Sequence, residues 1–105
     1  MERNRSMAYR VDFVADVHKQ LRGLTAGQRA LVFEAIEKQL RHEPFAETRN
    51  RKPLRPNPIA SWELRVREIR IFYEAVPEEH DRVRILAIGT KEGNIVMIGG
   101  KEILL

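Results

Sequence analysis

Hydrophobic and polar residues alternate through the middle of the chain, between residues 62 and 75. Every second residue from Trp62 to Val66 is apolar, and the part that follows Glu68 is rich in β-branched and aromatic residues. Both patterns predict strands. A two-residue loop at Arg67 and Glu68 would join these strands into a hairpin.

The period of two in such a hairpin assigns each side chain to one of two faces. One face collects apolar side chains, from Trp62, Leu64, Val66, Ile69, Ile71 and Tyr73. The other face carries Glu63, Arg65, Arg70 and Phe72. Arg65 then lies directly opposite Arg70, although like charges in a cross-strand pair destabilise a sheet. A phosphate or a carboxylate would bind two such guanidinium groups, because each offers paired hydrogen bonds.

A strand and two helices are predicted before the hairpin. Alternation over residues 8–13 indicates the strand, and apolar residues at helical spacing follow over residues 14–24. Thr25 and Gln28 have the spacing of a capping box at the start of a second helix. That helix should end before Pro44, because the residue that precedes a proline avoids helical geometry. We expect both helices to pack on the sheet as a helical hairpin.

A long basic loop is predicted between the helices and the central hairpin. Residues 44–61 have no hydrophobic period and combine prolines with basic side chains. Loops longer than about 12 to 15 residues are often functional or disordered. A solvated connector stiffened by proline is the alternative interpretation of this segment.

Two more strands are predicted after the hairpin. Residues 82–89 include a nearly continuous apolar run, which is typical of a central strand covered on both faces. A turn is expected over residues 90–94 and a strand over residues 95–98. The tail, residues 101–105, could add one edge pairing.

The composition predicts one globular domain, over residues 7–105, after a disordered extension of residues 1–6. The chain has 105 residues, of which 43% are hydrophobic and 32% charged, and no apolar run approaches the roughly 20 residues of a membrane span. No secretion signal is recognised. The absence of cysteine excludes disulfides and thiolate metal sites, and it fits a cytoplasmic protein. The three histidines have no spacing to other ligands, so neither a metal nor a cofactor is expected.

The charge favours acidic partners. Lysine and arginine total 19 against 15 acidic residues, which gives a net charge of +4. Nucleic acid and an acidic protein would both suit this excess, and a solvated surface would explain it equally well.

Several short phrases follow one another in a characteristic order: Met7-Ala8-Tyr9, Lys52-Pro53-Leu54, Trp62-Glu63-Leu64-Arg65-Val66, Ile69-Arg70-Ile71-Phe72-Tyr73 and Arg84-Ile85-Leu86-Ala87-Ile88-Gly89-Thr90-Lys91. At these spacings, nearly the whole chain after residue 7 resembles the RelE/ParE family of toxins from bacterial type II toxin–antitoxin systems. The resemblance implies an α+β fold, in which an N-terminal strand and a helical hairpin pack on a mainly antiparallel, twisted sheet of about four to five strands. It also implies a concave basic face.

The resemblance further implies a toxic activity that a cognate antitoxin neutralises. RelE-like members cut messenger RNA on the ribosome without a metal, whereas ParE-like members inhibit DNA gyrase. The working cations of RelE-like members correspond here to Arg65, Arg70 and Lys91. We therefore expect a RelE-like toxin with messenger RNA on the ribosome and an antitoxin as partners and no membrane partner. A homodimer and a toxin–antitoxin hetero-oligomer both remain open.

Two departures from the RelE pattern keep other functions open. Several RelE-like enzymes use a tyrosine or histidine near the C-terminus, and residues 94–105 contain neither. The position two residues before Arg65 is Glu63 and not a lysine. The alternatives are a ParE-like gyrase inhibitor without nuclease activity and a degenerate member that retains only antitoxin or nucleic-acid binding.

Metal-free RNA cleavage needs a base for the ribose 2′-hydroxyl, stabilisation of the phosphorane and an acid for the leaving oxygen. Arg65 and Arg70 are too basic to exchange protons near neutral pH, so they are candidates for phosphate clamps. Lys91 could act as acid or base if it were desolvated among cations. Glu63 is the alternative base, or it forms an ion pair that relieves the repulsion between the two arginines.

Four further residues are candidates for RNA binding. Lys52, Arg55 and Arg67 would contact phosphates, and Phe72 would stack on an unpaired base or pack beneath the C-terminal tail or an antitoxin. Tyr73 falls on the apolar face of the hairpin, so we assign it to the core.

Overall fold

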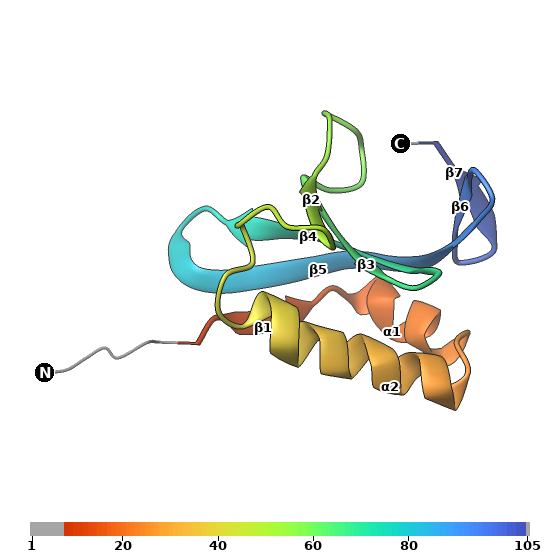
Figure 1. The fold of residues 1–105 in the computed structure, drawn as a ribbon, viewed down its shortest axis with the longest axis horizontal. Helices are drawn as coiled ribbons and strands as arrows, with labels where there is room; N and C mark the ends of the chain where they lie inside the picture. The colour runs from red at the N-terminus through yellow and green to blue at the C-terminus, as the bar shows by residue number, and fades with distance from the viewer. Residues whose placement is uncertain (1–7, 105) are drawn as a thin grey trace, which may run out of the picture.

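The computed structural model describes residues 8–104. Its helical elements are α1 (Ala15–Arg22), α2 (Ala26–Ala35) and a π-helical turn, η1 (Ile36–Leu40). Its strands are β1 (Arg10–Phe13), β2 (Arg51–Pro53), β3 (Trp62–Val66), β4 (Ile69–Val76), β5 (Glu79–Glu92), β6 (Ile95–Ile98) and β7 (Lys101–Ile103) (Figure 1). The expected extension over residues 1–6, the expected domain start at residue 7 and the last residue of the tail lie outside the described residues.

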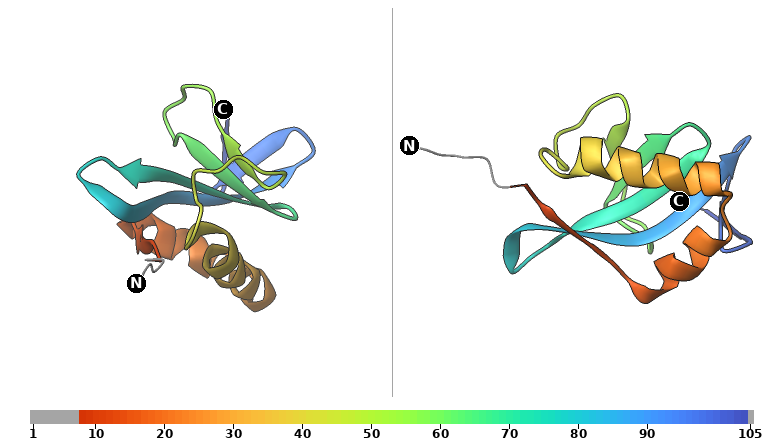
Figure 2. Two further views of the ribbon diagram at one scale, coloured as in Figure 1. Left: turned by 60° about the vertical axis from the view of Figure 1, so that its left-hand side comes forward. Right: turned by 90° about the horizontal axis from the view of Figure 1, so that it is seen from below.

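The strands form one sheet in the order β2-β3-β4-β5-β6-β7, and β1 pairs with β5. The β1–β5 pair is parallel, and the other pairs are antiparallel. Both helices lie on one side of the sheet, and the C-terminal hairpin and the loop after β2 lie on the other (Figures 1 and 2). The expected α+β class is confirmed. No helix within residues 8–104 has the length and hydropathy needed to cross a membrane.

The expected number of strands, four to five, is too low, because the sheet has seven strands within residues 8–104. Two of the additional strands, β2 and β7, are three residues long. Elements of that length are too short to show a period of two, so pairing with a neighbour defines them. The basic loop over residues 44–61 is therefore interrupted by β2, which pairs with β3.

Strand β5 organises the sheet and runs over 14 residues, well beyond the predicted range of residues 82–89. One of its edges pairs with β4, while β1 pairs with its first half and β6 with its end. Between these two neighbours, the Ile88 amide donates to Gln20 Oε1 from α1 at 2.7 Å. A Cβ atom at Gly89 would lie 2.2 Å from the Met97 carbonyl oxygen, so only glycine lets β6 approach this closely.

Helix α2 begins with the capping box that the sequence predicts. The Gln28 amide donates to Thr25 Oγ1 at 3.1 Å, and the Thr25 amide donates to Gln28 Oε1 at 2.9 Å. Each side chain thus satisfies a backbone donor that the first helical turn leaves free. The helix continues into η1, and the chain leaves helical geometry before Pro44, as expected.

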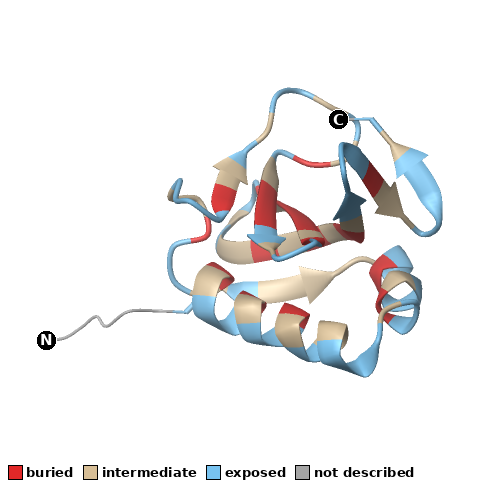
Figure 3. Cartoon of the chain, turned by 45° about the vertical axis from the view of Figure 1, so that its right-hand side comes forward, coloured by how far each residue is buried: buried red, intermediate tan, exposed pale blue. Residues whose placement is uncertain are grey.

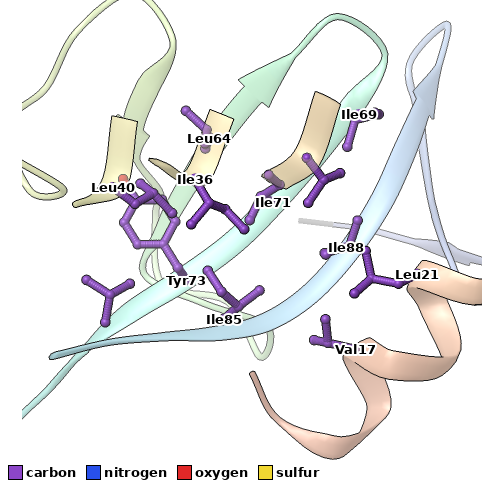
Figure 4. Packing of buried hydrophobic residues seen from close by; sticks show 12 residues of the cluster. Val17, Leu21, Ile36, Leu40, Leu64, Ile69, Ile71, Tyr73, Ile85 and Ile88 are labelled. Atoms are coloured by element: carbon purple, nitrogen blue, oxygen red, sulfur yellow. The ribbon is translucent and has the colours of Figure 1, made fainter. Parts of the chain in front are cut away.

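The main core lies between the helices and the face of the sheet that they cover, which we call the helical face (Figure 4). The predicted apolar face of the hairpin is confirmed, because Leu64, Ile69, Ile71 and Tyr73 are fully buried there. Exposed positions of α2 point away from the sheet (Figure 3). The Tyr73 hydroxyl donates to the Pro44 carbonyl at 2.6 Å, which satisfies its polar end inside the core.

A second, smaller core covers part of the opposite face of the sheet, which we call the open face. It is formed by the buried residues Ala60, Phe72, Ala87 and Val96, with Leu54, Ile59, Leu86 and Ile98 packed against them. These residues come from the loop after β2, from the central strands and from β6. The open face is therefore divided into an apolar part under the loop and β6, and a charged part beside it.

Candidate anion-binding face

The hairpin between β3 and β4 has the register that the sequence predicts. Val66 pairs with Ile69, and Arg65 lies directly opposite Arg70. The loop between the strands consists of two residues, and Arg67 has a φ of 55°, a value that a first loop residue needs in a tight hairpin. The two arginines therefore share the open face as cross-strand neighbours.

Arg65 is held by a carboxylate on its own strand. Its Nε donates to Glu63 Oε2 at 2.7 Å. The Glu63 side chain is only 7% exposed, whereas the Arg65 side chain is 47% exposed. A bond at Nε leaves the two terminal nitrogens of the guanidinium group for other acceptors, on the exposed side of the pair.

Arg70 is held by the turn that precedes it. Its Nη1 donates to the carbonyl oxygens of Arg67 and Ile69 at 2.6 and 2.9 Å. Desolvation lowers the pKa of Arg70, and Arg65 lowers it further, while Glu63 raises it. The charges of Arg65, Arg70 and Glu63 are thus close enough to influence one another, and the lowered pKa of Arg70 comes first from its partial burial.

Lys91 joins this group from β5. Gly89 pairs with Arg70, and Lys91 follows two residues later on the same face of the sheet. The Lys91 amide donates to the Glu68 carbonyl at 2.7 Å, which ties this end of β5 to the hairpin turn. Lys91 is exposed, and its side chain forms no ion pair within residues 8–104. We call Glu63, Arg65, Arg70 and Lys91 the anion face.

The predicted RNA-binding cations differ in their position. Lys52 pairs with Glu63 across β2 and β3, so it borders the anion face. Its Nζ lies 3.6 Å from Glu47 Oε2, with which it forms an ion pair. Arg67 is exposed in the hairpin turn. Arg55 is exposed in the loop after β2, where no strand pairing connects it to the anion face.

The assignment of Phe72 as an accessible base-stacking side chain is wrong for this structure. Phe72 is fully buried, and it packs with Ala60, Ala87 and Val96. Residues of the loop after β2 and of β6 pack around Phe72, and no residue of the tail over residues 101–104 belongs to this cluster. An aromatic residue on the polar side of a hairpin does not reveal whether a distant segment covers it.

Arg51 is a structural residue that the sequence pattern did not single out. It is 9% exposed, its Nε donates to the Ala46 carbonyl at 3.0 Å, and its Nη1 donates to both oxygens of Gln39. These bonds attach the start of β2 to the end of the helical layer. One arginine among several in a basic segment carries no local signal for such a role.

One hollow of the surface borders the anion face, at Arg65. This hollow, of about 270 Å³ between α2 and the end of β3, is lined in part by Arg65, Arg67, Lys38 and Asn50. A larger one, of about 890 Å³, lies between α1 and β6 and includes none of the four residues of the anion face. Residues 8–104 contain no group of three or more histidine, aspartate or glutamate side chains that could hold a metal ion.

A helical hairpin on one face of a mainly antiparallel sheet, with paired arginines on the other, is the architecture that the RelE/ParE resemblance implies. The structure is similar to the crystal structure of the toxin–antitoxin complex RelBE2 from Mycobacterium tuberculosis, with a TM-score of 0.67 and 28% sequence identity. The match covers 80% of this chain and 99% of that chain. No family model matches the sequence, and a search of curated proteins found no match.

The similarity to RelBE2 confirms the resemblance to the RelE/ParE family. The same similarity supports the view that this protein is a component of a toxin–antitoxin system.

Proposed function

We propose that this protein is a RelE-like toxin, which cleaves ribosome-bound messenger RNA at the anion face and is neutralised by a cognate antitoxin. The observation that carries the proposal is the direct pairing of Arg65 with Arg70, with Lys91 on the same face of the sheet. Two cations at directly opposed positions reduce the stability of a sheet. They fit a bound phosphate, which would bridge them.

The two arginines are assigned to the phosphate. The terminal nitrogens of Arg65 and the remaining donors of Arg70 would bind the non-bridging oxygens and stabilise the negative charge of the phosphorane. Neither guanidinium group exchanges a proton near neutral pH, so their contribution is electrostatic. Lys52 and Arg67 would hold the neighbouring phosphates of the strand, with Arg55 further along the loop.

Proton transfer is assigned to Lys91. It is an exposed amine on the same face of the sheet as both arginines, and its side chain forms no ion pair within residues 8–104. Glu63, the other candidate base, is nearly buried and its carboxylate is bonded to Arg65. That geometry supports a role for Glu63 in holding Arg65 more than a role in taking the proton of the 2′-hydroxyl.

Induced expression in bacterial cells tests the proposal. Growth should stop, and mapping of RNA ends should find new cuts within translated messages. The Arg70→Ala variant should lose both effects, whereas Arg22→Ala, which removes an exposed cation from the last turn of α1, should keep them. Growth arrest with intact messages would contradict RNA cleavage.

A ParE-like inhibitor of gyrase is the second candidate. Residues 94–105 contain no tyrosine or histidine, so the chain lacks there the acid that several RelE-like enzymes use. A toxin that binds its target through the basic face without breaking a bond would not need one. A supercoiling assay with purified gyrase distinguishes the two, because a RelE-like toxin leaves it unchanged at stoichiometric amounts. Growth arrest that disappears in Arg70→Ala would argue against the third possibility, a degenerate member that retains only antitoxin or nucleic-acid binding.

A further inference from the structure

Glu63 is a nearly buried carboxylate in the middle of a basic surface. It lies on β3 between Lys52 on β2 and Phe72 on β4, and the residue is 5% exposed. Its carboxylate accepts one hydrogen bond within residues 8–104, from Arg65 Nε at 2.7 Å. Its negative charge also raises the pKa of Arg70, against the larger lowering that burial causes. Glu63 therefore interacts electrostatically with both arginines of the pair.

The bond to Glu63 has a geometric effect on Arg65. A charge-assisted bond to Nε fixes the inner edge of the guanidinium group and directs its two terminal nitrogens outward. Arg65 is thereby ordered before any ligand binds, which reduces the entropy that binding would cost. A surface arginine without such a bond would sample many rotamers.

The same bond has an electrostatic effect that opposes the first. The two arginines carry two positive charges, and Glu63 removes one, so the three side chains together carry a net charge of +1. The affinity of a basic surface for single-stranded nucleic acid depends on how many phosphate charges it neutralises. Glu63 therefore orders the site and weakens its attraction for free RNA at once.

We propose that Glu63 is a positioning residue that also sets specificity: it holds Arg65 for the scissile phosphate while keeping the affinity for free RNA low. RNA then reaches the two arginines effectively only when a larger assembly presents it. The inference rests on the proposed function, since it concerns the same phosphate. With Glu63 in place, the basic surface of this protein would not bind just any RNA by charge alone.

Glu63→Gln separates the two effects. Glutamine has nearly the same shape and keeps an acceptor oxygen for Arg65 Nε, but it lacks the charge. Binding of a short unstructured RNA oligonucleotide, followed by fluorescence anisotropy, should tighten by about three- to tenfold at low salt. The slope of log affinity against log salt should steepen by about 0.7, the value for one more phosphate neutralised on a single strand.

Glu78→Gln is the matched control, because Glu78 is exposed in the turn between β4 and β5 and changes the net charge equally. It should leave both the affinity and the slope as in the unaltered protein. Glu63→Ala removes the acceptor as well as the charge, so it should also tighten RNA binding. If Glu63→Gln does not fold, as judged by its thermal melt, Glu63→Ala tests the effect of the charge in its place.

The positioning role is tested by cleavage of messenger RNA on purified ribosomes. Glu63→Gln should keep kcat within about threefold, while Glu63→Ala should lose it, because only glutamine restores the bond to Arg65. A large fall in kcat for Glu63→Gln, with loss of a limb of the pH profile, would show that Glu63 is the general base and overturn the inference.

Unchanged RNA affinity in both Glu63 variants would also overturn it. The proposed function fails separately: if Arg70→Ala binds RNA as well as the unaltered protein does, the arginine pair is not the phosphate site at all.

Discussion

The guanidinium group of Arg51 donates to both the backbone carbonyl and the side-chain oxygen of Gln39, at 3.1 and 2.6 Å. The contact joins the start of β2 to the end of the helical layer, across 12 residues of sequence. Because β2 pairs with the strand that carries Glu63 and Arg65, this contact supports the edge of the anion face.

Arg51→Ala should lower the free energy of unfolding by about 2 to 3 kcal/mol, because buried carbonyl acceptors lose a charged donor. Denaturant unfolding followed by circular dichroism measures this loss. Arg55→Ala is the control, since it removes an exposed arginine from the same loop and should change stability by less than about 0.5 kcal/mol. Equal losses in the two variants would show that Arg51 does not anchor the loop.

Arg67→Gly should stabilise the protein by about 0.5 to 1 kcal/mol. Arg67 is the residue other than glycine that has a positive φ within residues 8–104, and glycine adopts this conformation without the steric cost of a Cβ atom. The gain is partly offset because glycine makes the unfolded chain more flexible. Glu78→Gly, in a turn position without a positive φ, should instead destabilise the protein. The midpoints of thermal unfolding of the two variants should therefore move in opposite directions.

Arg65→Ala should destabilise the free protein by about 1 kcal/mol, although it removes one of two opposed cations. Repulsion between the arginines alone predicts a slight gain. The bond to Glu63 reverses the sign, because the nearly buried carboxylate would lose its partner. The double variant, Arg65→Ala with Glu63→Gln, should lose less unfolding free energy than the sum of the losses in the two single variants. Additive losses would mean that the two side chains are not coupled in solution.

The stability of the protein should fall above about pH 10, the ordinary pKa of tyrosine, in part because of Tyr73. Burial raises the pKa of the Tyr73 hydroxyl in the folded protein above that value. The unfolded chain then releases this proton first, so the stability that Tyr73 contributes is complete below pH 10 and is lost as the pH rises further. Tyr73→Phe cannot ionise there. The difference in unfolding free energy between the two proteins should therefore be constant from pH 7 to 9. Above pH 10 the protein with Tyr73 should lose stability relative to the Tyr73→Phe variant.

Much of the central hairpin could be derived from local sequence. The two-residue loop at Arg67 and Glu68 fixes the register, and the period of two then places Arg65 opposite Arg70. The capping box of Thr25 and Gln28 is equally local, because its two hydrogen bonds join residues three apart. These features follow from spacing alone, and the structure reproduces both of them.

Features that depend on distant segments could not be derived in this way. Phe72 has the position of a ligand-binding aromatic on the open face, but Ala60 and Val96 cover it. Strand β2 exists because its partner strand lies beside it, and its three residues have no period of their own. Sequence spacing gives the face of a side chain and says nothing of what packs over that face.

The sequence by itself determined that two arginines meet on one face of a hairpin, because register and alternation are short-range properties of the chain. The tertiary structure decided how much of that face stays accessible and how its charges are balanced. It buries Glu63 between β2 and β4, leaves Arg65 half exposed above it and brings Lys91 in from β5. These relationships arise only when strands far apart in the sequence pair, since burial and charge coupling depend on distance in space.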